Sequence, residues 1–308
     1  MTAKTWGLDL RIWDVQRGSA MWVSAAQKDV VIDMGASNFS PIQHLEERSS
    51  INSIDYMIIT HPHRDHIIDI TQYEESDFDV SILCRNKATR PVLEERIEEE
   101  DDESYLEIAT TYAEFEDRYT TPATEDPSSK DWAQGATFSN YFLSGDDVSG
   151  STFDQLNNLS VITVIERHGF KLVTAGDILE DGIETAMDDG KIMDAVEDAH
   201  VLVAPHHGRK SSYVGEFVDQ IDPEIVLISD KADNGNNASG YYTKPDGISV
   251  LDEPDDEFCD RTVLTTRKDG RLRVRANHED DWLVSFYDQF ASKRAKGSMA
   301  RKNYHRAY

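Results

Sequence analysis

The sequence predicts a mixed α/β protein, and three observations support this fold class. Short apolar runs such as 54–59 and 201–204 recur along the chain and predict buried strands. Stretches with helical spacing separate several of these runs. Three strand ends carry histidine or aspartate, and ligands at the ends of successive strands meet at one edge of a sheet. The chain is therefore expected to hold a site at such an edge.

The first third of the chain alternates strands with short helices. Its strands are expected at 8–15, 20–24, 30–33, 54–59 and 81–84, and its helices at 41–47 and 67–73. Gln16-Arg17-Gly18-Ser19 is expected to turn the chain between the first two strands. Thr60 ends the strand 54–59, which leads directly into a group of histidines.

The segment 90–150 differs in composition and is predicted to be an acidic helical insertion with a flexible end. Residues 98–103 form an unbroken acidic run, and 120–129 is rich in proline, threonine and serine. Such a charge run is typical of a solvated face, and the alternative is a docking site for a partner protein.

Regular structure is expected to resume at Leu159. A hairpin is predicted over 161–175, one helix over 183–196 and another over 212–220. Further strands are expected, with a Lys268-Asp269-Gly270 turn between the last two: 201–204, 225–229, 261–264 and 272–274. We expect one domain over 1–290, followed by a basic, flexible tail over 291–308 that could also contact a partner.

The bulk properties limit the possible functions. The 308-residue chain has a net charge of −28, which disfavours a free-standing, nonspecific DNA-binding protein. A salt-rich cytoplasm, an acidic insertion away from the site, or a basic partner would each explain the charge. No segment reaches the ~20 apolar residues of a membrane span, and no signal peptide is evident. The two cysteines fit a reducing compartment, so we expect a cytoplasmic protein without membrane contact.

His61, His63, Asp65 and His66 form the most informative cluster in the sequence. The whole chain has only 10 histidines, so three within six residues are not a chance grouping. Imidazole and carboxylate are ligands for borderline divalent metals such as zinc, and four of them can serve more than one ion. The alternative is a polar loop whose histidines have no role.

Two further strand ends carry candidate ligands. Asp177 follows Ala175-Gly176, where glycine allows the backbone to approach closely, and a carboxylate there could bridge two ions. The alternative role for Asp177 is a helix N-cap. His206-His207 follows the strand 201–204 and precedes Gly208; the alternative is a surface pair.

These motifs resemble the metallo-β-lactamase fold superfamily, and within it the soluble domain of the DNA-uptake protein ComEC. The resemblance spans most of the chain except the acidic segment and the tail. It is carried by the H-x-H-x-D-H cluster and by five shorter stretches, namely 14–20, 31–35, 157–160, 174–177 and 205–208. The late strand pair at 265–273 adds to it.

The resemblance implies an αββα sandwich with a binuclear site at one edge. It assigns His61, His63 and Asp177 to a first metal, and Asp65, His66, Asp177 and His206 to a second. Asn157-Asn158 stands where the superfamily often has another histidine, so the first ion is expected to bind more weakly or keep an open position. Arg17 and Ser19 replace the usual glycine and aspartate in the N-terminal turn.

The expected activity is that of a metal-dependent phosphodiesterase or nuclease acting on DNA, RNA or a nucleotide. Two divalent ions, zinc or alternatively manganese, would hold a bridging hydroxide as nucleophile. Asp65, Asp177 and His207 are the expected catalytic residues, with His207 free to bind phosphate or protonate the leaving group. The roles of His206 and His207 could also be exchanged.

Four residues are candidates for substrate binding: Asn158, Ser160, Arg209 and Lys210. Two other functions remain open. One is hydrolysis of a carboxylic ester, lactone, thioester or β-lactam by the same metal chemistry. The other is a subunit of a multi-protein system, such as one for defence against foreign DNA, that is active only after assembly.

Overall fold

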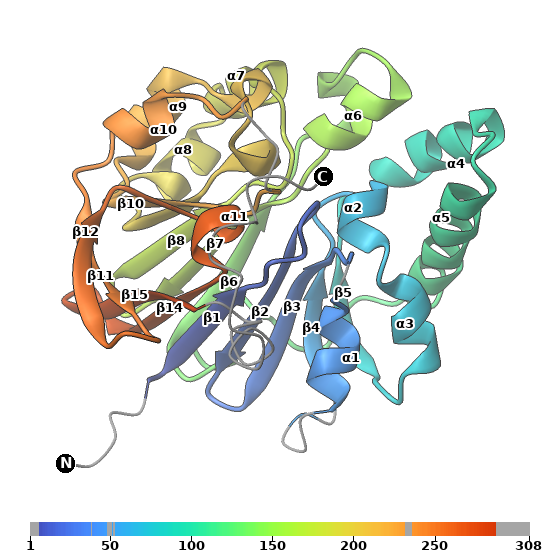
Figure 1. Ribbon diagram of the computed structural model, residues 1–308. Helices are drawn as coiled ribbons and strands as arrows, with labels where there is room; N and C mark the ends of the chain where they lie inside the picture. The colour runs from blue at the N-terminus through green and yellow to red at the C-terminus, as the bar shows by residue number, and fades with distance from the viewer. Residues whose placement is uncertain (1–5, 38, 48–50, 52, 232–235, 288–308) are drawn as a thin grey trace, which may run out of the picture.

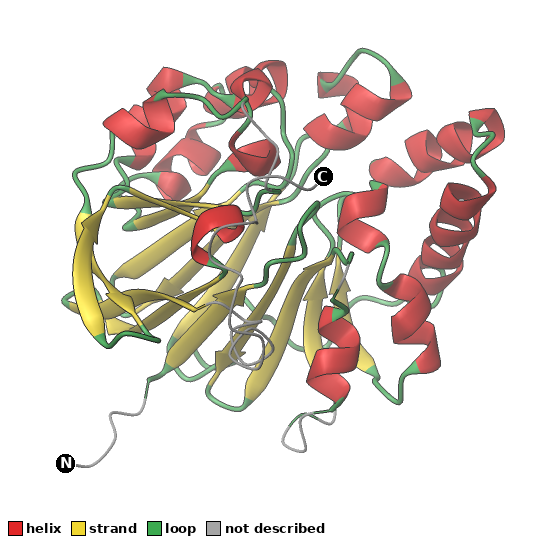
Figure 2. Ribbon diagram, viewed as in Figure 1, coloured by secondary structure: helices red, strands yellow, loops and turns green. Residues whose placement is uncertain are grey.

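The computed structural model describes residues 6–37, 39–47, 51, 53–231 and 236–287. Two β-sheets stack in the middle of the molecule, and helices cover their outer faces (Figures 1 and 2). The first sheet has nine strands in the order β12-β11-β15-β14-β1-β2-β3-β4-β5, and the second has six in the order β13-β10-β9-β8-β7-β6. The predicted αββα sandwich is confirmed.

The first sheet combines the N-terminal strands with the last strands of the described chain. Its strands are β1 (Leu8–Ile12), β2 (Ala20–Ala25), β3 (Lys28–Met34), β4 (Ile54–Ile58), β5 (Val80–Cys84), β11 (Ile248–Asp252), β12 (Glu257–Arg261), β14 (Arg271–His278) and β15 (Asp281–Tyr287). The helices that follow its early strands are α1 (Pro41–Glu46), α2 (Arg64–Ile67), α3 (Ile70–Glu75), α4 (Thr89–Glu99) and α5 (Glu103–Glu116). Strands β3, β4 and β5 run parallel, whereas β1 pairs antiparallel with both β2 and β14.

The second sheet is built from the middle of the chain. Its strands are β6 (Ala136–Tyr141), β7 (Ile162–Arg167), β8 (Phe170–Thr174), β9 (Val201–Val203), β10 (Ile225–Ile228) and β13 (Val263–Thr265). Its helices are α6 (Thr152–Asn158), α7 (Glu180–Met187), α8 (Gly190–Val196), α9 (Gly215–Ile221), α10 (Gly240–Thr243) and α11 (Thr266–Asp269). Short 3₁₀ turns cover Gly145–Asp147, Pro205–Gly208 and Lys210–Ser212.

Side chains along the strands alternate between the core that lies between the sheets and the faces that the helices cover. In β3, Val30 and Ile32 pack into the core between the sheets, whereas Val31 and Met34 pack against the helices. In β9, Val201 points to the same central core while its neighbour packs toward α7–α9. Successive side chains of a strand point to opposite faces, so strands that are apolar on both faces require a covering layer on each side.

Most predicted elements are present, with two differences. The hairpin over 161–175 is confirmed as the antiparallel pair β7 and β8. The single helix expected over 183–196 is wrong, because the chain forms α7 and α8 with a break at Asp189, whose side chain caps the second helix at the Lys191 amide. The two last predicted strands are also not neighbours, since β13 lies in the second sheet and β14 in the first.

The acidic segment 90–150 contains two helices and a strand of the second sheet. One face of α5 is apolar and packs into the core between the first sheet and its covering helices, with Tyr112 and Phe115 fully buried. The acidic side chains of 98–103 lie at the end of α4 and in the α4–α5 connection, mostly exposed. Strand β6 pairs with β7 and adds Phe138 to the central core. That the segment is an insertion relative to related proteins stays a prediction.

The basic tail expected over 291–308 lies outside the described residues. Cys84 and Cys259 are both free thiols. Among the helices of the described part of the chain, none combines the length and the apolar character that crossing a membrane requires.

Candidate metal centre

The histidine cluster, Asp177 and the His206-His207 pair come together in space. The cluster follows β4 of the first sheet, whereas Asp177 follows β8 and the histidine pair follows β9 of the second sheet. Strands β8 and β9 are parallel neighbours, so their carboxyl ends lie side by side. The site therefore sits where one edge of each sheet meets the other.

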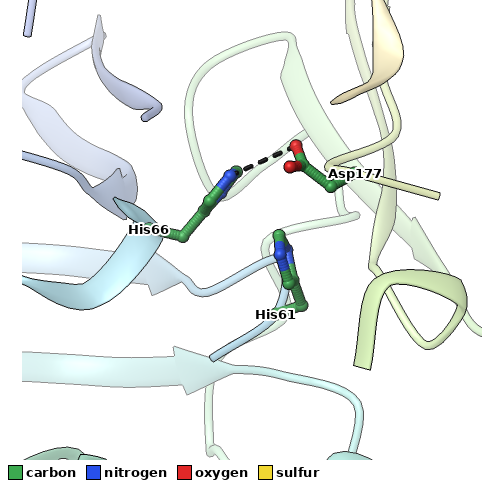
Figure 3. A group of neighbouring side chains, drawn as sticks. All are labelled: His61, His66 and Asp177. Carbon is green, nitrogen blue, oxygen red and sulfur yellow. Dashed lines mark ion pairs between the residues drawn. The ribbon is translucent and has the colours of Figure 1, made fainter. Parts of the chain in front are cut away.

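One group of candidate ligands consists of His61, His66 and Asp177 (Figure 3). His66 Nε2 lies 3.2 Å from Asp177 Oδ1, and the ring of His61 packs against that of His66 with centroids 4.2 Å apart. His61 Nε2 is also 3.0 Å from Nδ1 of His63. These three histidines and one carboxylate converge within a few ångströms although they come from two sheets.

A second group consists of Asp65, His66 and His207. His207 Nε2 lies 3.6 Å from Asp65 Oδ2 and 3.4 Å from Asp177 Oδ2. The two oxygens of Asp177 thus face different imidazoles, Oδ1 toward His66 and Oδ2 toward His207. A carboxylate in this position can serve two ions, whereas an imidazole whose other nitrogen is occupied can serve only one.

The donor set fits divalent metal ions. Two nitrogen ligands at ~2.0–2.1 Å from a tetrahedral zinc ion are about 3.3 Å apart, close to the separations of the atoms in these groups. Nε2 of His63, His66 and His207 is buried and makes no well-aligned hydrogen bond among the described residues, although those of His66 and His207 lie 3.2 Å and 3.4 Å from Asp177 oxygens. Buried polar atoms are nearly always satisfied, so three such nitrogens beside two carboxylates fit the donor set of a metal site.

The second nitrogen of each imidazole is held by the protein. His66 Nδ1 lies 2.7 Å from Asp33 Oδ2, and His207 Nδ1 donates to the Ser229 carbonyl at 2.9 Å. Asp33 also accepts from the amide and hydroxyl of Thr60, the residue before His61. Such contacts orient metal-binding histidines and fix their tautomer. Asp33 is a residue of the site to which the sequence pattern gave no role; its place at the end of a buried strand was the available signal.

The structure distinguishes His206 from His207. Both have left-handed backbone angles, with φ of 48° and 57°, an uncommon conformation for residues other than glycine. The imidazole of His207 points at Asp65 and Asp177. Nε2 of His206 instead accepts a hydrogen bond at 2.9 Å from Arg209, which can only donate, and it lies 3.8 Å from Asp177. The geometry therefore favours His207, not His206, as the ligand.

Burial and mutual charge set the ionisation of these groups. Burial lowers the pKa of His63 to about 4 and also lowers that of His61. Burial opposes protonation of His207 too, but Asp177 and Asp65 outweigh it and raise the pKa of His207 to about 10. Although burial alone would raise the carboxyl pKa values of Asp65 and Asp177, their contacts with His207 and His66 lower both. A metal ion must displace such protons, so its affinity rises with pH.

Asn158 and Ser160, expected to bind substrate, have structural contacts instead. Both are almost fully buried. Ser160 Oγ accepts from the Asp177 amide at 3.1 Å, and Asn158 Oδ1 accepts from the Leu179 amide at 3.0 Å. They therefore position the loop that carries Asp177. A Cβ on Gly176 would lie 2.7 Å from Ser160 Oγ, which explains why this loop requires glycine.

Asn157, beside His63, differs from Asn158. It is fully buried, and its side chain lies within hydrogen-bonding reach of His63. Asn157 thus stands beside the cluster at the position where the resemblance implies asparagine in place of a further histidine.

Cationic side chains surround the cluster. Arg17 is 66% exposed and its Nε lies 3.6 Å from Asp65 Oδ2. Arg209 is bound to His206, and Lys210 is exposed next to it. Arg64 is exposed and paired with Asp102 at 3.1 Å. Arg209 thus contacts His206 next to the centre, Lys210 follows it in the chain, and Arg17 reaches Asp65 from the β1–β2 loop.

A cavity of about 800 Å³ lies elsewhere, between the β11–β12 hairpin and α11. Arg261, Lys268 and Asp269 are among its lining residues, and none of the candidate metal ligands lines it. The metal cluster therefore does not sit at the bottom of this cavity.

The comparison with known protein families agrees with this geometry. The sequence model of the metallo-β-lactamase superfamily matches residues 13–229, a span that includes the cluster, Asp177 and both later histidines. The chain belongs to the metallo-β-lactamase superfamily. The predicted family is thus confirmed, and at the level of that family the chain is a hydrolase whose fold generally binds divalent metals.

Relatives agree on family and fold. The chain is 24% identical over 282 residues to ComE operon protein 3 of Bacillus subtilis (strain 168), covering 85% of this chain but 32% of that protein. It thus spans about a third of that relative's length, and this similarity agrees with the predicted ComEC-like branch.

Two solved structures share the fold at low identity. The metallo-β-lactamase fold protein YhfI of Bacillus subtilis is 12% identical, with 71% of this chain and 84% of that chain covered and a TM-score of 0.38. A diphosphatase from the PhnP family is 11% identical, with 71% and 85% covered and a TM-score of 0.39. Likenesses this weak do not indicate an activity.

Proposed function

We propose that this protein is a binuclear metal-dependent phosphodiesterase that acts on nucleic acid or a nucleotide. The main support is the position of Asp177, whose two carboxylate oxygens face His66 at 3.2 Å and His207 at 3.4 Å. Arg17, an exposed cation, lies 3.6 Å from Asp65, and the exposed Lys210 follows His207 by three residues, although the chain as a whole carries a charge of −28. A local cationic rim around acidic ligands suits a polyanionic substrate.

The residues fit two ions as follows. His61, His63 and Asp177 would hold the first ion, with Asn157 beside them. Asp65, His66, Asp177 and His207 would hold the second. Zinc is the expected metal and manganese the alternative, because histidine-rich sites accept both. When bound, such a pair of ions activates water near neutral pH and neutralises charge on the attacked and leaving oxygens of a phosphoester.

The remaining residues of the centre have distinct tasks. Asp33 and Ser229 hold the rings of His66 and His207 with their Nε2 atoms toward the metals. His206 accepts from Arg209 through Nε2, so its own proton is on Nδ1 beside Ser212 Oγ at 3.0 Å. His206 therefore positions Arg209 and does not supply a proton to the leaving group in this arrangement.

Arg209 and Lys210 would bind the phosphate oxygens. Arginine offers a planar pair of donors and lysine a point charge, and both lower the cost of bringing a phosphodiester next to two carboxylates. Arg17, whose Nε lies 3.6 Å from Asp65 Oδ2, would bind the phosphate from the loop between β1 and β2.

Hydrolysis of bis-p-nitrophenyl phosphate and of single- and double-stranded DNA and RNA tests the proposal, with zinc and with manganese. The Asp177→Ala variant is expected to lose all activity and to bind fewer ions per chain. Hydrolysis of a lactone or thioester, with no phosphodiester cleaved, would instead identify the small-ester alternative. No hydrolysis of any substrate until another protein is added would identify an assembly-dependent subunit.

A paired substitution tests the assignment of the two adjacent histidines. His207→Ala should lower the number of bound ions, measured by metal analysis of the dialysed protein. His206→Ala should keep the ions and weaken substrate binding through Arg209. The reverse result would restore His206 as the ligand.

A further inference from the structure

Phe153 is an aromatic side chain at the metal centre to which the proposed chemistry assigns no task. It lies in α6, and its ring stacks on that of His63 with centroids 4.1 Å apart and an interplanar angle of 22°. Phe153 nevertheless remains 48% exposed, whereas His63 beneath it is only 5% exposed. One ring face is thus covered by a metal-site histidine, and the exposed surface belongs to the rest of the ring.

Helix α6 brings this ring beside the candidate metal ligands. The helix contacts α4, which covers the first sheet, and α7, which covers the second (Figure 1). Its Ser151 cap accepts from the Asp154 amide and fixes the first turn, where Phe153 lies. Its last turn carries the buried Asn157 beside His63. The ring is therefore held on a short, capped helix that lies between a helix covering the first sheet and a helix covering the second.

A role in supporting the His63 ring does not by itself explain why Phe153 is exposed. Burying a phenylalanine is worth about 1.5–3 kcal/mol, so a residue that served only as a packing support is favoured when it is covered. Phe142 and Phe258 are also exposed, at 43% and 62%, but of these three exposed phenylalanines it is Phe153 whose ring stacks on a candidate metal ligand. Aromatic side chains on which bases stack, together with cationic side chains that bind the backbone, are the combination by which proteins bind single-stranded nucleic acid.

We infer that Phe153 is a stacking platform for a nucleobase next to the scissile phosphate, and that the substrate class is single-stranded nucleic acid. This inference rests on the proposed function. In a duplex each base already stacks on its neighbours, so a platform of this kind selects unpaired bases. Arg17 and Lys210, both exposed, would hold the flanking sugar-phosphate backbone. Phe153 is then a specificity residue, and the phosphate beside the stacked base would lie at the candidate metal ligands.

The test compares two oligonucleotides of equal length and charge, one of thymidines and one with abasic sugars at every position. Equilibrium binding of the zinc-loaded protein is measured by fluorescence anisotropy, with phosphorothioate linkages to slow cleavage. Phe153→Ala should weaken thymidine-oligonucleotide binding about 5- to 150-fold, which corresponds to ~1–3 kcal/mol per stacked base. Binding of the abasic oligonucleotide should change less than about twofold.

Two control variants separate stacking from packing. Phe153→Leu keeps an apolar contact with His63 but has no aromatic face, so it should behave like Phe153→Ala; Phe153→Trp should restore the preference for bases. Metal content is measured for every variant. Equal loss of affinity for both oligonucleotides, or a loss that follows metal content, would show a packing role and overturn the inference.

The same measurements distinguish a failure of the stacking platform from a failure of the proposed phosphodiesterase function. Absence of bis-p-nitrophenyl phosphate hydrolysis by the wild-type protein would contradict the phosphodiesterase, whatever the binding data show. Normal hydrolysis together with identical affinities of wild type and Phe153→Ala for the thymidine oligonucleotide would contradict the stacking platform alone.

Discussion

Replacing Asp33 with asparagine should weaken the metal ion held by His66. The Asp33 side chain is 1% exposed and accepts from His66 Nδ1 at 2.7 Å, from the Thr60 amide at 2.8 Å and from the Thr60 hydroxyl at 2.9 Å. Asparagine keeps the shape but replaces one acceptor oxygen with a donor group. In one orientation the new NH₂ group would face the Thr60 donors and lose their hydrogen bonds. In the other it would donate a hydrogen bond to Nδ1 of His66.

The second outcome changes the tautomer of His66. A donor at Nδ1 moves the imidazole proton to Nε2, the atom that faces Asp177 and that the ion needs. Loss of a contact of this kind lowers metal affinity about 10- to 100-fold, or roughly 1.4–2.7 kcal/mol at 1.36 kcal/mol per tenfold change. One of the two ions should be affected more than the other.

Competitive titration with a chromophoric chelator measures this change, together with metal stoichiometry after dialysis. Asp55→Asn is the matched control, because Asp55 also accepts hydrogen bonds in the first sheet, from Lys28 and the Asp29 amide, but is remote from the cluster. Wild-type affinity in a folded Asp33→Asn protein, or an equal loss in both variants, would refute the reasoning.

Three further outcomes are expected. Gly176→Ala should destabilise the protein and reduce bound metal, because the new Cβ would meet Ser160 and Thr60 within 2.8 Å; chemical denaturation and metal analysis report both. Phe115→Ala should cost about 3–5 kcal/mol in urea unfolding, since the ring is fully buried; a change under 1 kcal/mol would mean that α5 is a loosely attached helix. Burial raises the pKa of Asp69 to about 6, so its contribution favours folding below its unfolded pKa of 3.8 and is lost as the pH rises through 6; Asp69→Asn should flatten stability between pH 4 and 7 relative to wild type.

The sequence alone determined the fold class and the residue types of the candidate metal centre. A strand that is buried on both faces is a continuous run of apolar residues. The end of such a run therefore marks the end of a strand, as it does before His61–His66, Asp177 and His206-His207. Ligand types are equally local, since imidazole and carboxylate define the metal chemistry whatever the fold. The acidic run 98–103 was also correctly placed beside helices, because charge and helical spacing are properties of the segment itself.

Tertiary structure decided which side chains face the centre. His206 and His207 are adjacent and chemically identical, and only the positions of Arg209 and Ser229 separate them. Asn158 and Ser160 were expected to meet substrate, but contacts with residues about twenty positions later bury them under the Asp177 loop. Such contacts join parts of the chain that are distant in sequence, and local pattern carries no record of them. For the same reason the stacking of Phe153 on His63, 90 positions earlier, was visible only in the folded protein.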